Sequence, residues 1–232
     1  QDHLTGAEIA FGGDVSRSLK GDNYLVMETQ AQGFPQWLPY PGQLRLQAFS
    51  HLASGANGVM YWHWGSLHNG CETYWKGLLS QDFAPNPTYR EACTIGADFA
   101  RLSEKLIDLK VENRVAILVS NEALTGAAAF PMGDGVAYND VVRGVYDALY
   151  RQNIGCDFIG PESGRLADYD LLIAPALYCA DDGLLQRLKS YVEGGGHLLA
   201  TFKFGFSDEE TKVRADLQPA GLSELFGASY SQ

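Results

Sequence analysis

The chain has 232 residues, of which 46% are hydrophobic and 19% are charged, a composition typical of globular domains. It contains no run of 18 or more apolar residues, so no transmembrane helix is predicted. The formal net charge of −11 disfavours nucleic acids and anionic membranes as partners, because both are bound mainly through Lys and Arg.

The first 110 residues alternate between apolar strands and amphipathic helices. A helix-like segment opens the chain, and a basic turn follows it. The elements expected after this turn are a strand at 24–28, a helix opened by Pro41-Gly42 and ended by Gly55, a strand at 58–64, a loop at 65–77 and a helix at 90–109. This alternation is the pattern of βα units around a parallel sheet.

The pattern restarts after the charged segment "LKVENRV", where a domain boundary is predicted between residues 110 and 111. The elements expected beyond it are strands at 114–120, 156–160, 169–177 and 197–202, a Gly-rich loop at 125–140, and helices at 141–153 and 183–195. Apolar strands that alternate with amphipathic helices indicate a second, doubly wound α/β domain over 111–232.

The four cysteines are widely spaced, and no Cys/His group has the spacing of metal ligands. We therefore predict free thiols in a reducing compartment, a cytoplasmic location, and neither a cofactor nor a metal.

The strand "YLVME" ends in a carboxylate, Glu28, and the following strand leads to a second one, Glu72. The carboxyl edge of a parallel sheet carries the active site in α/β barrels, and a buried charge is costly unless it is paired or used. Aromatic rings accompany both acids in the two loops: Trp37 after the first strand, and Trp62, Trp64, Tyr74 and Trp75 at and after the second.

Rings with a few carboxylates suit a sugar, because the apolar face of a pyranose stacks on tryptophan and carboxylates accept bonds from its hydroxyls. Glycoside hydrolysis itself uses two carboxylates. The residues alone leave two other interpretations open: the rings pack in a core, and each Glu serves as a helix cap or an ion-pair partner.

The stretch from Tyr24 to Phe83 resembles the last part of the barrel of the glycoside hydrolase family 42 β-galactosidases. The motifs that carry this resemblance are Met27-Glu28-Thr29, Trp37, "PGQLRL" at 41–46, "GANGVMYWHW" at 55–64 and "ETYWKG" at 72–77. The second half, with "RVAILVSNEAL" and "YVEGGGHLLATF", is similar to the second domain of that family.

The resemblance implies the C-terminal part of a (β/α)8 TIM barrel, followed by a flavodoxin-like or class I amidotransferase-like α/β domain that builds a trimer. It implies a retaining β-galactosidase acting on galactosides or oligosaccharides. Glu28 would be the nucleophile, Trp37 would stack on galactose and Glu72 would hold its hydroxyls. The strand-end Trp64 would floor the pocket or be a barrel-core ring.

Three departures from the family pattern affect the expected site. The family's sugar-binding histidine is Trp75 here, so the site is reshaped or His63 or His68 supplies the lost contact. The arginine that follows the family's strand-end tryptophan is Gly65.

The third departure is the general acid/base, which in the family is a glutamate after an asparagine on an earlier barrel strand. The one Asn-Glu pair of this chain, Asn121-Glu122, falls in the second domain, so the chain is expected to be inactive alone. A non-catalytic galactoside-binding module and an oligomerisation module are the alternatives. Cys179, the one candidate for amidotransferase chemistry, lacks a Gly-x-Cys-x-Gly elbow, so a packing role is expected.

Overall fold

The computed structural model describes residues 6–33, 37–131 and 133–231 of the chain. It divides into two compact units, residues 1–111 and 112–232, and each unit is described by itself.

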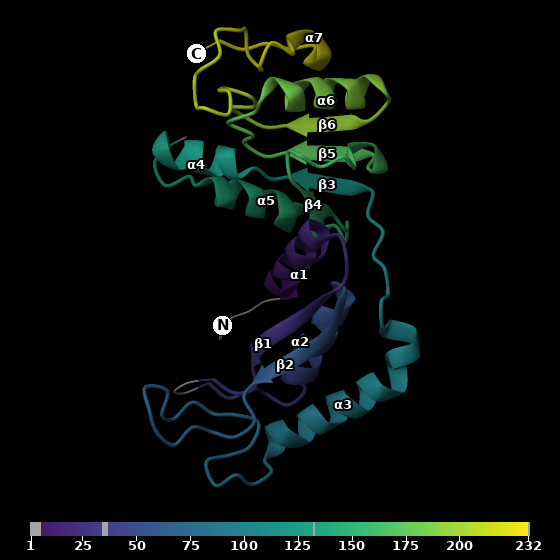
Figure 1. Ribbon diagram of the computed structural model, residues 1–232, viewed down its shortest axis with the longest axis vertical. Coiled ribbons are helices and arrows are strands. Elements are labelled where there is room, and N and C mark those ends of the chain that lie inside the picture. The colour runs from purple at the N-terminus through teal and green to yellow at the C-terminus, as the bar shows by residue number, and fades with distance from the viewer. Residues whose placement is uncertain (1–5, 34–36, 132, 232) are drawn as a thin grey trace. The chain divides into compact units, whose positions relative to one another are not determined.

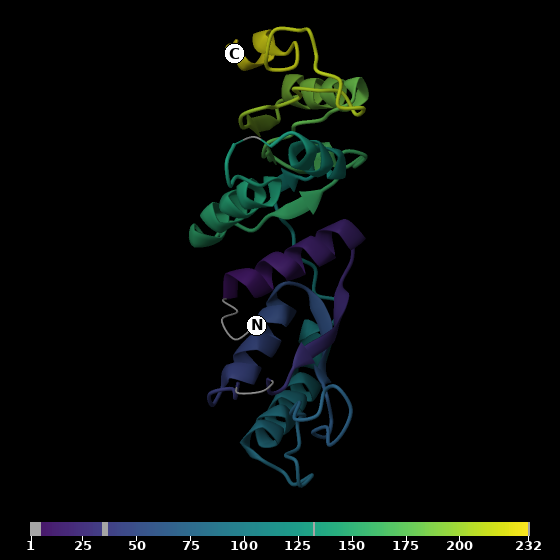
Figure 2. The ribbon, with the colours of Figure 1, turned by 90° about the vertical axis from the view of Figure 1, so that its left-hand side faces the viewer.

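The described part of the first unit is a pair of parallel strands packed on helices (Figures 1 and 2). Its elements are α1 (Gly6–Lys20), β1 (Tyr24–Gln30), α2 (Gln43–Ala53), β2 (Ala56–Trp62) and α3 (Pro87–Leu106). The helix α2 contacts α1, α3 and β2. The register pairs Thr29 with Tyr61 and Gln30 with Trp62, and an irregularity lies between Val26 and Thr29.

The two faces of this sheet differ in burial because side chains alternate along each strand. One face packs against a core formed by Leu44 and Ala48 of α2 and Ile95 of α3, to which Tyr61 contributes. The other face is open, and its exposed apolar side chains are Leu25, Met27, Met60 and Trp62. Parallel sheets are normally covered on both faces, which is the arrangement inside a closed barrel.

The motif "PGQLRL" forms the start of α2 and has a structural role. Gly42 adopts a φ of 88°, and the Glu91 carboxylate of α3 accepts hydrogen bonds from the backbone N–H groups of Gly42 and Arg45, both at 3.0 Å. The guanidinium of Arg45 in turn binds Asp98 of α3 at 2.8 Å. The start of α2 is therefore capped by a side chain from another helix.

The helix α3 begins three residues before the predicted Arg90, at Pro87. The side chain of Asn86 accepts a hydrogen bond from the Tyr89 N–H at 2.9 Å, and proline is favoured in the first helical turn.

The described part of the second unit holds a four-stranded parallel sheet in the order β4-β3-β5-β6. Its strands are β3 (Val115–Leu118), β4 (Asp157–Ile159), β5 (Leu171–Ala174) and β6 (His197–Ala200). The helices are α4 (Asn121–Ala129), α5 (Tyr138–Arg151), α6 (Asp182–Glu193), α7 (Ser223–Phe226) and a short 3-10 turn at Leu166–Asp168. This strand order is that of a doubly wound, flavodoxin-like sheet.

The prediction of a Gly-rich loop over 125–140 was wrong at both ends, because α4 extends to Ala129 and α5 begins at Tyr138. Ser120 caps this helix, since its hydroxyl accepts a hydrogen bond from the Ala123 N–H at 3.0 Å. A Cβ on Gly126 would lie 2.6 Å from the Cys179 sulfur, so the glycine permits close packing rather than a loop.

Candidate active site

Glu28 is exposed and lies two residues before the end of β1. Because β1 and β2 are parallel, their carboxyl ends share one edge of the sheet, and the Ala31 N–H donates to the Trp62 carbonyl at 3.4 Å there. Glu28 therefore lies near the carboxyl end of β1, and its place beside the loops that follow the two strands stays a prediction.

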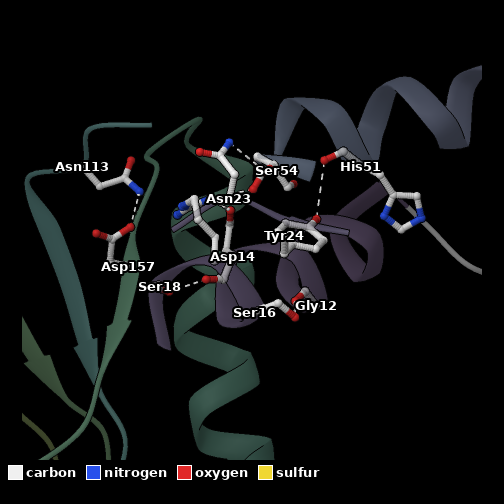
Figure 3. A network of polar contacts seen from close by, with 12 residues as sticks. Gly12, Asp14, Ser16, Ser18, Asn23, Tyr24, His51, Ser54, Asn113 and Asp157 are labelled. Carbon is white, nitrogen blue, oxygen red and sulfur yellow. Dashed lines mark hydrogen bonds and ion pairs between the residues drawn. The ribbon is translucent and has the colours of Figure 1, made fainter. Parts of the chain in front are cut away.

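Glu28 also lines a cavity of about 360 Å³ between β1, α1 and α2. The hydroxyl of Tyr24 lies 3.5 Å from the His51 carbonyl in this region (Figure 3). Burial raises the pKa of Tyr24 to about 12 and lowers the pKa of His51. The helix α1 approaches Tyr24 closely because Gly13 has no side chain, since a Cβ there would lie 2.4 Å from the phenol oxygen. Other residues that line the cavity include Glu8, Gly12, Ser16, Thr29 and Gln47.

Trp37 lies in the loop between β1 and α2 and is half-buried. The Gly33 N–H donates to the Trp37 carbonyl at 3.0 Å, and a Cβ on Gly33 would lie 2.7 Å from the Trp37 Cβ. The tryptophan is therefore seated directly on the glycine, which is itself buried.

The sequence predicted Trp64 as the last residue of its strand. This was wrong, because β2 ends at Trp62. The strand stops where the chain turns into the next loop, and the Leu79 N–H then bonds the Trp64 carbonyl at 2.9 Å. Trp64 is 63% exposed, and its ring meets Tyr89 of α3 edge to face, with ring centroids 5.9 Å apart.

The loop after β2 folds back on itself through backbone bonds. Leu67 donates to the Trp75 carbonyl at 2.9 Å, and Leu78 donates to the His63 carbonyl at 2.7 Å. Glu72 lies in the turn of this loop and is exposed, whereas Trp75 is half-buried against the loop. The two acids thus occupy different settings, with Glu28 on a strand and Glu72 in a turn ten residues beyond the end of β2.

The two histidines proposed to replace the family's histidine differ in their surroundings. A ring nitrogen of His68 lies 2.6 Å from the Gln81 carbonyl, and the ring stacks on Phe83. The His63 ring stacks on Trp62, and its Nε2 atom is buried without a partner in the described part of the chain. Loop contacts therefore occupy His68, while His63 retains an unused polar atom.

Sequence reasoning missed Gln32, which is only 5% exposed. Its side-chain amide donates to the Gly77 carbonyl at 2.7 Å and joins the loop after β1 to the loop after β2. The sequence offers one sign of this role: Gln32 is a polar residue in the short segment between β1 and Gly33. Its partner lies 45 residues away and has no signal of its own.

In the described residues no group of three or more His, Cys, Asp or Glu could hold a metal ion, and no helix is long and apolar enough to cross a membrane. Cys179 is buried, accepts a hydrogen bond from the Ser207 hydroxyl at 3.2 Å, and has a thiol pKa that burial raises. These are the surroundings of a core thiol rather than of an activated nucleophile.

Parallel βα units with acids and rings at the carboxyl edge of their strands, followed by a doubly wound domain, are features of α/β-barrel glycoside hydrolases. The profile described as "Beta-galactosidase" matches residues 1–102, and the profile described as "Beta-galactosidase trimerisation domain" matches residues 113–232. The chain belongs to the glycoside hydrolase family 42 β-galactosidases, as its motifs had indicated.

Individual relatives agree with this assignment. The β-galactosidase BgaH of Haloferax lucentense is 33% identical over 230 residues, covering 97% of this chain and 34% of that protein. BgaA of Clostridium cellulovorans is 30% identical over 224 residues, covering 94% of this chain and 34% of that protein. The solved β-galactosidase of Halorubrum lacusprofundi superposes with a TM-score of 0.87 at 29% identity, over 98% of this chain and 34% of that one.

The predicted fold class, part of a TIM barrel followed by an α/β domain, is confirmed by this superposition. The chain spans about a third of the length of the curated relatives that it matches.

Proposed function

We propose that the protein to which this chain belongs is a retaining β-galactosidase that hydrolyses terminal β-D-galactosides, with Glu28 as its nucleophile. The observation that carries the proposal is the exposed Glu28 carboxylate at the shared carboxyl edge of two parallel strands, in a chain of this family. The relatives named as β-galactosidases support the substrate class.

In the proposed reaction the Glu28 carboxylate attacks the anomeric carbon while a general acid protonates the departing glycosidic oxygen. A covalent galactosyl-enzyme results. The general acid is a second carboxylate, which then acts as a base and deprotonates a water molecule. This water attacks the anomeric carbon and releases Glu28, so that the configuration is retained.

The second carboxylate is expected from a barrel strand outside residues 1–232. The Asn121-Glu122 pair begins α4 of the second unit, where the Ser120 hydroxyl donates to the Glu122 carboxylate at 2.9 Å. We therefore propose that this chain alone does not hydrolyse galactosides, because loss of general acid/base catalysis costs roughly 10²–10⁴-fold.

The substrate-binding roles are proposed for side chains of the two loops. Trp37 stacks on the apolar face of galactose, Glu72 accepts bonds from its hydroxyls, and the exposed Trp64 ring forms the floor of the pocket. Trp75 presents a ring where the family has a histidine, and His63, with its unpartnered buried nitrogen, is the better placed of the two histidines to supply a polar contact.

We propose that residues 1–110 are the barrel portion and that residues 111–232 build the contacts of a homotrimer. The match of residues 113–232 to the trimerisation domain supports the second assignment. A cytoplasmic location remains part of the proposal and is supported by four cysteines that are all free.

The experiment is Glu28→Gln in the complete protein, with Glu104→Gln on the exposed surface of α3 as the matched control. Loss of the nucleophile is expected to lower kcat by roughly 10⁴-fold or more, with the control unchanged. Glu28→Ala should recover turnover with azide and yield the α-galactosyl azide, because azide replaces the missing carboxylate. Full activity of Glu28→Gln would refute the assignment, and galactose binding without turnover by the unaltered protein would favour a binding module.

A further inference from the structure

The described residues between β1 and α2, 31–33 and 37–42, include Trp37, and side-chain bonds to other parts of the unit hold them on both sides of the gap. Glu91 of α3 holds the distal end through the backbone N–H groups of Gly42 and Arg45. Gln32 holds the proximal end through the Gly77 carbonyl, four residues after Glu28. The two anchors bracket the tryptophan.

The acceptor of the Gln32 bond is a rigid point of the loop after β2. Gly77 is buried, its N–H donates to the Ser66 hydroxyl at 3.0 Å, and that hydroxyl donates to the Leu79 carbonyl at 2.8 Å. A Cβ on Gly77 would lie 2.5 Å from the His63 carbonyl oxygen, so two backbone segments are in direct contact there. The Gln32 amide therefore binds a part of the loop that cannot readily move.

The connection from Gln32 to Trp37 is short. Gln32 is followed directly by Gly33, whose N–H bonds the Trp37 carbonyl and whose α-carbon lies against the Trp37 side chain. Any shift of Gln32 moves Gly33 and hence the seat of the tryptophan. Without the amide, the buried Gly77 carbonyl would lose this partner, and the loop would move to relieve it.

We infer that Gln32 is a positioning residue for substrate binding, which sets the place of the Trp37 ring relative to the loop that carries Glu72. This inference rests on the proposed function, since it concerns the galactose site of the same protein. Gln32 itself touches neither the reacting atoms nor Glu28 in this account. Its loss should weaken binding of ground state and transition state alike, so KM rises while kcat is kept.

The test is Gln32→Leu in the complete protein, assayed with an aryl β-galactoside. We expect KM to rise by roughly 10-fold at an almost unchanged kcat, because a displaced binding ring weakens binding uniformly. Asn23→Leu is the matched control, since Asn23 is also a buried amide, donating to the Gly55 carbonyl at 3.0 Å and the Leu109 carbonyl at 3.1 Å, at the opposite end of β1. It should lower the melting temperature without changing KM.

A second variant, Gln32→Glu, keeps the shape of the side chain and replaces only the donor. The ionised carboxylate cannot donate to the Gly77 carbonyl, whereas the protonated carboxyl can. Burial raises the pKa of such a carboxyl, so the carboxyl regains its proton as the pH falls. The ratio of this variant's KM to that of the unaltered protein, both measured at the same pH, should then approach one.

The outcomes separate the inference from the proposed function. An active unaltered protein whose Gln32→Leu and Gln32→Glu forms keep a normal KM at all pH values overturns the inference alone. An equal rise in KM for Gln32→Leu and Asn23→Leu, or a Gln32→Glu defect that does not change with pH, overturns it as well. An unaltered complete protein that hydrolyses no galactoside overturns the proposed function and this inference together.

Discussion

Gly126→Ala tests the packing of the second unit, because this glycine of α4 faces the chain that follows β5. The added Cβ would lie 2.6 Å from the Cys179 sulfur and 3.1 Å from the Tyr178 ring. Neither neighbour has room to withdraw, since Cys179 is 2% exposed and Tyr178 is 6% exposed. Overpacking of this kind costs about 1–3 kcal/mol, and the better helix propensity of alanine returns about 1 kcal/mol, so we expect a net loss of about 1 kcal/mol.

Gly144→Ala in α5 is the matched control, because a Cβ at Gly144 has no atom within 4 Å. This variant should gain about 1 kcal/mol from helix propensity alone. Urea unfolding of the complete protein, combined with hydrogen exchange of the α4 amides, measures both changes, since exchange isolates the local free energy of opening.

The second mutation Cys179→Ala identifies the cause of the loss. With the sulfur removed, only the 3.1 Å contact with the Tyr178 ring remains, so Gly126→Ala should cost less than it does beside Cys179, giving a coupling free energy of about 0.5–3 kcal/mol between the two sites. A Gly126→Ala variant as stable as Gly144→Ala in the presence of Cys179 would refute the packing described for α4.

Three further predictions concern the first unit. Gly33→Ala in the complete protein should raise KM because the new Cβ displaces Trp37, whereas Gly96→Ala, with no atom within 4 Å, should not; steady-state kinetics compare them. Glu91→Ala should lower the free energy of unfolding by about 1–2 kcal/mol, because the first turn of α2 loses its cap; urea midpoints measure this. Burial raises the pKa of Tyr61 to about 12, so its contribution to stability is complete below pH 10 and is lost as the pH rises towards 12. The melting temperature of Tyr61→Phe should therefore fall less between about pH 8 and about pH 11 than that of the unaltered protein. An identical fall would contradict the burial described.

The sequence predicts the elements that apolar periodicity encodes. The strands β1 and β2, the helix α2 between them and the second parallel sheet follow from local patterns, and the position of Glu28 on the first strand follows from the apolar run before it. The helix α4 was missed because Gly126 is typical of a loop when its neighbour is unknown. Gly126 and Cys179 are 53 residues apart in the sequence, so no local pattern could reveal their contact.

The parts of the site that depend on loop paths could not be predicted. The bond from Gln32 to Gly77 spans 45 residues, and the cap of α2 by Glu91 spans 49. Both depend on contacts between segments that are far apart in the sequence. The exposure of Trp64 could not be predicted either, because the end of β2 is set by the hydrogen bonds of the returning loop and not by the aromatic run itself.

The most direct test of the central claim is to trap the covalent intermediate in the complete protein. A 2-deoxy-2-fluoro-galactosyl fluoride inactivates a retaining β-galactosidase by forming a slowly hydrolysed ester with its nucleophile. Peptide mapping by mass spectrometry then identifies the modified carboxylate. We predict the label on Glu28, in the peptide that contains "YLVMETQ". A label on any other acid, or turnover with no covalent adduct and an inverted product, would contradict the assignment of Glu28 as the nucleophile.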